Sequence, residues 1–204
     1  MQEIEIGYQL SYAVRISYAG ELGWELYTPS EMSLPVYDRL LEAGADFGLK
    51  HCGYHTLNTL RIEKAYREWA HDIGPRDNPL DAGLAFTCDW DKPDGFIGRD
   101  ALLALRDQPR TRRLVQFLLD DPEPLLVHNE SILRNGERIS YTTSAGYGHT
   151  LGASVALGYL TSDLEIDAKF VSDAEYVIEQ ADRSYKAKAS LKPMYDPTST
   201  RTRT

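Results

Sequence analysis

The chain has 204 residues, 42% of them hydrophobic and 26% charged, and its 22 Lys and Arg against 31 Asp and Glu give a formal net charge of −9 at pH 7. Such a composition is typical of a globular protein and excludes a disordered chain, a collagen-like fibre and a coiled-coil rod. A strongly acidic protein repels phosphate backbones, so we expect no nucleic-acid partner.

The cysteines and the N-terminal residues indicate the compartment. The chain has two cysteines, Cys52 and Cys88, which lie too far apart for a CxxC motif and fit a reducing environment. The first residues lack the basic and apolar regions of a signal peptide, and the apolar runs are too short to span a bilayer. We therefore expect a cytoplasmic protein that does not enter a membrane.

Residues 7 to 28 predict a β-hairpin with a glycine-rich turn. A turn centred on residues 21 and 22 would place Tyr18 directly opposite Glu25, with both side chains on one face of the sheet. Such a pair can bind a flat heterocycle. The tyrosine ring offers a surface on which the heterocycle stacks, and the carboxylate accepts two parallel N–H bonds from an aminopyrimidine edge. An exposed glutamate beside a packing tyrosine is the simpler interpretation, and spacing alone favours it.

Three helices are expected before residue 106. Their predicted ranges are Ser33 or Pro35 to Gly44, Gly53 to Tyr66, and Arg99 to Leu105. The run from Arg61 to Trp69 carries three cations and two anions, which predicts a salt-bridged helix surface facing solvent.

Two short motifs resemble functional sites without completing them. His51, Cys52 and His55 lie within five residues, but Gly53 separates the histidines and the glutamate of a zinc-protease motif is missing, so we expect no metal site. The segment from Gly146 to Gly152 departs from the dinucleotide-binding fingerprint and leads toward a strand, which favours a glycine-rich turn.

The pattern changes near residue 109, beyond which short strands replace helices. The predicted strands are Leu114 to Leu119, Ser131 to Leu133, Arg138 to Thr142, Ser154 to Tyr159, Glu175 to Ile178 and Ala187 to Ser190. These predict a small antiparallel barrel or sandwich over residues 110–204, after an α+β portion over residues 1–109. With helices expected only before the boundary, the whole chain is predicted to be α+β.

Several segments, in order, resemble the folate-dependent aminomethyltransferase family, which includes the glycine cleavage T-protein and the C-terminal halves of sarcosine and dimethylglycine dehydrogenases. The matching segments are Ile16 to Tyr27, Leu60 to Trp69, Asp72-Ile73, Pro79 to Leu84, Phe96 to Leu102, Thr142 to Gly148 and Met194 to Pro197. The Trp24-Glu25 and Tyr66 to Trp69 sequences resemble the amine-oxidising branch more than the T-protein. Leu57 occupies a position where the T-protein usually has an arginine, which places a contact to the acidic tail of folate in doubt.

The resemblance implies a tetrahydrofolate site. In the family, the carboxylate at the position of Glu25 grips the pterin-like ring, the tyrosine at the position of Tyr18 lines the same pocket, and Tyr195 is a third candidate. The implied reaction transfers a one-carbon unit from a small N-methyl amine of the sarcosine, dimethylglycine or glycine type to tetrahydrofolate.

The resemblance also implies that this chain lacks part of the active site. The catalytic aspartate of the family lies upstream of the matched segments, so no catalytic residue is assigned here, and an N-terminal half or a flavoprotein subunit is expected to complete the site. Two alternatives remain open: a non-catalytic folate-binding or interaction domain, and a tetrahydrofolate-dependent demethylase of the same fold.

Overall fold

A computed structural model describes residues 1–203 of the chain. These residues form two compact units, one made of residues 1–60 and the segment from Thr198 onward, the other of residues 61–197. Thr204, the last residue of the predicted barrel range, lies outside the described residues. The predicted division at residue 109 is a different boundary, and it stays a prediction.

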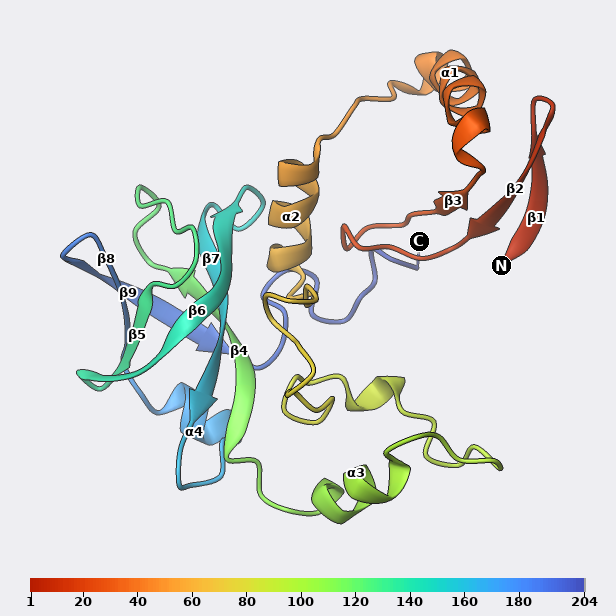
Figure 1. Ribbon diagram of the computed structural model, residues 1–204. Coiled ribbons are helices and arrows are strands. Elements are labelled where there is room, and N and C mark those ends of the chain that lie inside the picture. Colours follow the sequence, from red (N-terminus) through yellow and green to blue (C-terminus); the bar gives the residue numbers. More distant parts are fainter. Residues whose placement is uncertain (204) are drawn as a thin grey trace. The chain divides into compact units, whose positions relative to one another are not determined.

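The first unit contains a three-stranded antiparallel sheet in the order β1-β2-β3, followed by a helix (Figure 1). The strands are β1 (Gln2–Ile6), β2 (Gln9–Val14) and β3 (Glu25–Tyr27). A 3₁₀ turn at Ser30–Met32 leads into α1 (Ser33–Gly44), which has the predicted bounds, and Ala45–Phe47 form another 3₁₀ turn. Pro35 fits the first turn of α1, where backbone N–H groups have no partner within the helix.

The hairpin predicted between residues 7 and 28 has a different register in the structure. Glu25 pairs with Val14, and residues 15–24 form a long loop instead of a two-residue turn, so the prediction that Tyr18 lies opposite Glu25 was wrong. A two-residue turn needs residues that tolerate positive φ at its centre, and neither Glu21 nor Leu22 suits that position.

The segment from residue 54 to residue 106 carries two helices, α2 (Tyr54–Glu63) and α3 (Arg99–Arg106), and a 3₁₀ turn at Ala85–Thr87. Helix α3 was predicted almost to the residue, whereas α2 ends three residues earlier than expected. Ala65 adopts a left-handed φ of 55°, the Tyr66 N–H bonds to the Arg61 carbonyl, and the Ala65 N–H bonds to the Ile62 carbonyl. This is the Schellman geometry that ends helices, here built on alanine instead of the usual glycine.

Six antiparallel strands close into a barrel in the order β4-β7-β6-β5-β8-β9, with β9 returning to β4 (Figure 1). They are β4 (Arg112–Leu119), β5 (Ser131–Arg134), β6 (Glu137–Gly148), β7 (Ala153–Thr161), β8 (Tyr176–Gln180) and β9 (Arg183–Ser190). All six strands were predicted. Positive φ values of 52° at Asn135 and 86° at Gly136 suit a type I′ turn between β5 and β6. The predicted α+β class with a small antiparallel barrel is confirmed.

One short helix corrects the expectation that helices lie only before residue 109. Helix α4 (Ala168–Ser172) lies between β7 and β8, and the Asp167 side chain caps it by accepting the Phe170 N–H at 2.7 Å. Five residues are too few to show a helical period in the sequence.

Strands β4 and β7 have hydrophobic side chains on both their inner and their outer face. Alternate residues such as Val115, Phe117 and Leu160 fill the interior. Leu114 and Leu157 belong instead to a second cluster, which includes Ile62 and Ala65 from the end of α2 and the turn after it. The outer surface of these strands therefore positions the charged segment that follows α2.

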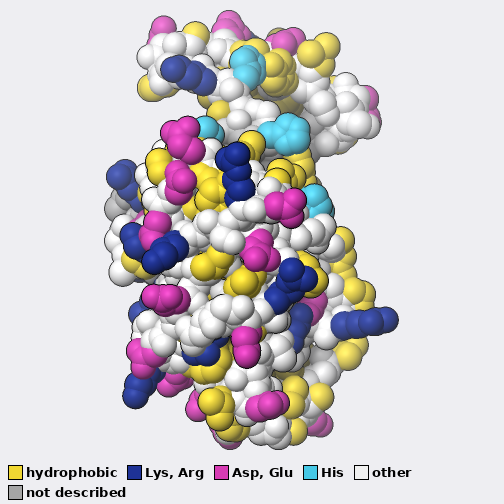
Figure 2. Space-filling model, turned by 90° about the vertical axis from the view of Figure 1, so that its left-hand side faces the viewer, with side chains coloured by type: hydrophobic (Ala, Val, Ile, Leu, Met, Phe, Trp, Pro, Cys, Tyr) yellow, Lys and Arg dark blue, Asp and Glu magenta, His cyan; other side chains and the backbone are white. Residues whose placement is uncertain are grey.

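The described residues contain no helix that is long and apolar enough to cross a membrane. On the face shown in Figure 2, acidic and basic side chains are interspersed, with hydrophobic side chains between them.

Candidate functional site

Glu25 begins strand β3 and is half-buried. The Tyr27 hydroxyl donates a hydrogen bond of 2.7 Å to Glu25 Oε2, because residues two apart on a strand point to the same face. Tyr12 pairs with Tyr27 across the sheet, so its ring shares this face. The hydrogen bond with Glu25, followed by the charge of that carboxylate, raises the pKa of Tyr27.

The aromatic neighbours of Glu25 on the sheet are therefore Tyr27 and Tyr12, not the predicted Tyr18. Tyr18 is half-buried in the loop between β2 and β3. The period of two within residues 25–27 could have identified Tyr27 from the sequence, whereas Tyr12 depends on a register that the sequence did not reveal.

The face formed by Glu25, Tyr12 and Tyr27 has the chemistry of a receptor for a flat heterocycle. A carboxylate offers about four acceptor positions, so one hydrogen bond from Tyr27 leaves capacity for N–H donors of a ligand. The two tyrosine side chains are 48% and 55% exposed, which leaves their rings accessible for stacking.

Tyr195, the third predicted residue, lies in the second unit and is half-buried. Its neighbours are held on both sides. The Met194 N–H donates to Gln116 Oε1 at 2.7 Å, and Asp196 forms an ion pair of 2.7 Å with Lys64. Tyr195 thus lies in a short segment whose neighbouring residues are bonded to buried side chains of the same unit.

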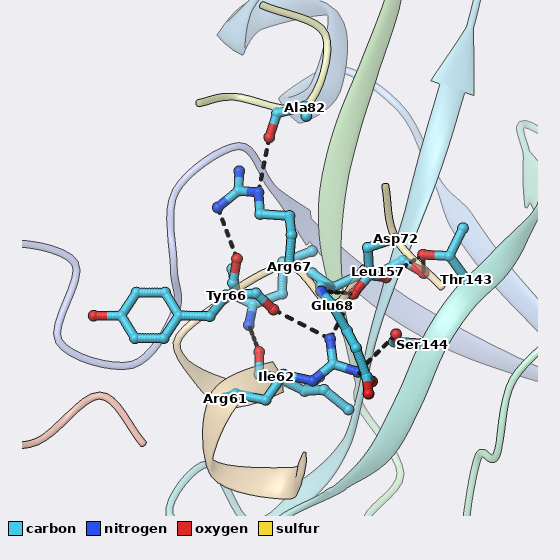
Figure 3. Close-up of polar contacts among 12 residues, drawn as sticks. Arg61, Ile62, Tyr66, Arg67, Glu68, Asp72, Ala82, Thr143, Ser144 and Leu157 are labelled. Carbon is cyan, nitrogen blue, oxygen red and sulfur yellow. Dashed lines mark hydrogen bonds and ion pairs between the residues drawn. The ribbon is translucent and has the colours of Figure 1, made fainter. Parts of the chain in front are cut away.

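A buried ionic cluster surrounds Arg61, in the last turn of α2 (Figure 3). Arg61 donates to Asp72 at 2.5 Å and to Glu68 at 2.7 Å, with side chains that are 2%, 0% and 23% exposed respectively. Its guanidinium also donates to the Ser144 hydroxyl at 2.8 Å and to the Tyr66 carbonyl at 3.1 Å. The charged groups are therefore paired and hydrogen-bonded, as burial requires.

The barrel contributes to this cluster through an irregularity in β6. The pairing of β6 with β7 shifts between Thr142 and Ser144, which marks a β-bulge at Thr143. The Thr143 hydroxyl donates to the Asp72 carboxylate, while the Thr142 hydroxyl donates to the buried Glu130. The bulge allows consecutive hydroxyl side chains to satisfy different buried charges.

Glu63 fixes the turn between β6 and β7. Its Oε1 accepts the backbone N–H groups of Thr150 at 2.7 Å and Leu151 at 2.9 Å. The glycine-rich segment from Gly146 to Gly152 therefore includes the end of β6 and a turn, as predicted, and that turn is held by a buried carboxylate.

The prediction that Arg61 to Trp69 forms a solvent-facing, salt-bridged helix was wrong. Arg61, Glu63 and Lys64 are each 1% exposed, and the helix ends at Glu63. Their partners lie between 5 and 132 residues away along the chain, and no local pattern in the sequence predicts these contacts.

In the described part of the chain, no group of three His, Cys, Asp or Glu side chains could hold a metal ion. His51, at the start of the segment considered for zinc, contacts the Tyr37 hydroxyl through Nδ1 at 3.1 Å.

Comparisons with known proteins match both parts of the chain. Residues 1–92 match the model of the GCVT N-terminal domain, and residues 112–196 match that of the glycine cleavage T-protein C-terminal barrel domain.

Two curated relatives are similar along most of the chain. The 4-methylaminobutanoate oxidase (formaldehyde-forming) of Paenarthrobacter nicotinovorans is 45% identical over 100% of this chain and 24% of the relative. The mitochondrial sarcosine dehydrogenase of Homo sapiens is 40% identical over 93% of this chain and 21% of the relative. The chain thus spans less than a quarter of the length of these relatives.

A solved structure has the same fold. The glycine cleavage system aminomethyltransferase T from Bartonella henselae superposes with a TM-score of 0.77 and 23% identity, over 97% of this chain and 53% of that one. This likeness concerns the fold. The two family models show that the chain belongs to the glycine cleavage T-protein family, and it matches the C-terminal part of its longer relatives.

Proposed function

We propose that the chain is the folate-binding portion of an aminomethyltransferase-like enzyme, which transfers a one-carbon unit from an N-methyl amine to tetrahydrofolate. The observation that carries this proposal is the Glu25 carboxylate, placed on one sheet face beside the exposed rings of Tyr12 and Tyr27. In the family that the chain resembles, the carboxylate at this position grips the pterin-like ring.

The residues present fit that ligand. Glu25 would accept the paired N–H donors of the aminopyrimidine edge, and the tyrosine rings would offer stacking area. Tyr18 and Tyr195 are the further residues that we propose for folate binding. Tetrahydrofolate would supply the nitrogens that accept the one-carbon unit, while this chain would bind and orient it.

The names of two relatives support the proposed substrate class. One is named for oxidising 4-methylaminobutanoate with release of formaldehyde, and another for sarcosine, so both act on N-methyl amines. Formaldehyde is the form in which such a one-carbon unit leaves if nothing captures it. A folate held close to the reacting amine would capture the unit before water does, because proximity replaces a bimolecular encounter.

Another part of the protein, or a partner subunit, would complete the site. Among the described residues 1–60, the buried apolar side chains are Ala13 and Val36, while Trp24, Phe47 and Tyr54 are more than 60% exposed. Exposed aromatic side chains of this kind are suited to contact with a covering part of the protein. We propose that the covering part carries the catalytic carboxylate and the flavin chemistry, and that the assembly works in the cytoplasm.

The transfer can be tested in the full-length protein. With an N-methyl amine as substrate, tetrahydrofolate should lower the yield of free formaldehyde and produce one-carbon folate in its place. Glu25→Gln should restore formaldehyde release while leaving amine oxidation unchanged, because only capture depends on the folate pocket. If the wild-type protein released the same amount of formaldehyde with and without tetrahydrofolate, the proposed transfer would be refuted.

A further inference from the structure

We propose that Lys64 and Gln116 are positioning residues for folate binding, which fix Tyr195 by anchoring the residues on either side of it. This inference rests on the proposed function, in which Tyr195 is one of the residues proposed for folate binding. Lys64 and Gln116 contact Asp196 and Met194 within the second unit, and neither needs to touch the ligand.

The first anchor is a buried ammonium group. The Lys64 side chain is 0% exposed, and its Nζ donates both to the Asp196 carboxylate at 2.7 Å and to the Asp196 backbone carbonyl. Contact with both groups fixes the backbone as well as the side chain. Asp196 has a φ of 42°, in the left-handed region that L-residues other than glycine seldom adopt, so its conformation needs such support.

The second anchor is the buried amide of Gln116 in β4. Its Nε2 donates to the carbonyls of Ile62 at 2.7 Å and Glu63 at 3.0 Å, and its Oε1 accepts the Met194 N–H at 2.7 Å. The opposite amide orientation would bring donor against donor and acceptor against acceptor. The three bonds therefore define one orientation and connect the Tyr195 segment to the end of α2.

The two anchors hold the residues immediately before and after Tyr195. Met194 and Asp196 flank Tyr195 directly, so fixing both leaves the Tyr195 backbone little freedom, and the backbone conformation selects the side-chain rotamer. Tyr66 lies close to the same anchor, since burial and then the charge of Asp196 raise its pKa. A ring held in this way loses less conformational entropy when a ligand stacks on it.

A positioning role differs from a purely structural one in how variants combine. If Lys64 acts through Tyr195, removing the tyrosine leaves nothing for Lys64 to position, and the two substitutions cannot be additive. If Lys64 only stabilises the fold, its effect on folate affinity is independent of Tyr195.

The test uses the full-length protein and two measurements, the dissociation constant for tetrahydrofolate and the hydrogen exchange of residues 191–197. Lys64→Met should quicken exchange in this segment by about tenfold, with the barrel strands unchanged, because the anchors hold the Met194 N–H in place. It should weaken folate binding about as much as Tyr195→Ala, and the double variant should be no weaker than Tyr195→Ala alone. Lys188→Met, which removes an exposed lysine paired with Asp120 at 3.4 Å, is the matched control and should change neither measurement.

Asp196→Asn and Gln116→Met provide milder variants if Lys64→Met does not fold, and the same non-additivity with Tyr195→Ala is expected of each. Additive losses, or unchanged folate affinity despite faster exchange, would overturn the positioning role. A wild-type protein that binds no tetrahydrofolate would overturn the proposed function and this inference with it, whereas wild-type binding with additive variants overturns the inference alone.

Discussion

The guanidinium of Arg61 lies 2.5 Å from the carboxylate of Asp72, in a position where the two side chains are 2% and 0% exposed. Removing two charges from water costs several kcal/mol per ion, so such a pair persists only with good geometry and further hydrogen bonds. The Glu68 N–H and the Thr143 hydroxyl donate those bonds to Asp72, and the Ser144 hydroxyl accepts one from Arg61. The cluster thereby attaches the segment after α2 to the barrel.

Asp72→Ala should therefore lower the free energy of unfolding by about 3–5 kcal/mol, because Arg61 stays buried and loses the fully buried member of its two carboxylate partners. Urea denaturation measures this change. Glu42→Ala is the control: it removes an exposed partner of Arg39, with side chains 56% and 71% exposed, and should change stability by less than about 1 kcal/mol. Equal effects of the two substitutions would contradict the structural importance of the buried cluster.

The close contact at Gly158 in β7 predicts a steric effect. A Cβ at this position would lie 2.5 Å from Ile132 Cδ1 and 2.9 Å from the Tyr141 carbonyl oxygen. Gly158→Ala should destabilise the barrel by about 1–3 kcal/mol in thermal or urea unfolding. At Gly53, where a Cβ meets nothing within 4 Å, the same substitution should cost less than about 1 kcal/mol. Similar values at both glycines would contradict the packing of β7 against β5 and β6.

Glu63→Gln should loosen the turn after β6. The charged acceptor of the Thr150 and Leu151 N–H groups becomes a neutral one, which weakens both bonds by a total of about 1–2 kcal/mol. Hydrogen exchange at these two amides should quicken, while exchange within β4 stays slow. Unchanged protection at both amides would show that Glu63 does not hold the turn.

The raised pKa of Tyr159 predicts that the folded protein loses stability at alkaline pH. Burial is the main cause that raises its pKa to about 12 from the ordinary value of 10.0, and its hydroxyl has no hydrogen-bond partner in the described part of the chain. Between these pH values the unfolded chain loses the tyrosine proton and the folded chain keeps it, so stability falls as pH rises.

Tyr159→Phe removes this contribution. The difference in unfolding free energy between the wild-type protein and the variant should be constant below about pH 9 and should fall by about 2–3 kcal/mol by pH 12. Other buried tyrosines titrate in both proteins and cancel in the comparison. A difference that does not vary with pH would contradict the raised pKa.

The sequence predicted elements whose signals are local. Alternating residues identified the barrel strands, and Gly98 and Gly44 bounded helices α3 and α1. The end of α2 was missed because Ala65 occupies the left-handed position where a glycine would have signalled it. A five-residue helix such as α4 has no period to detect.

The candidate site was predicted less completely, because its contacts depend on strand register and on distant partners. Glu25 was singled out from its spacing and from a family resemblance, but the loop after β2 shifted its sheet partner from Tyr18 to Val14. The burial of Lys64 depends on Asp196, which lies 132 residues away, so a charged run that is usually exposed became part of the core.

The most direct test of the folate site is calorimetric titration of the full-length protein with tetrahydrofolate, comparing Glu25→Gln with Glu42→Gln. A charge-assisted hydrogen bond contributes about 1.5–3 kcal/mol, so Glu25→Gln should weaken binding on the order of 10- to 100-fold, while Glu42→Gln on the exposed side of α1 should bind like the wild type. Equal affinities in all three proteins, or no binding to the wild-type protein, would contradict a folate pocket built on Glu25.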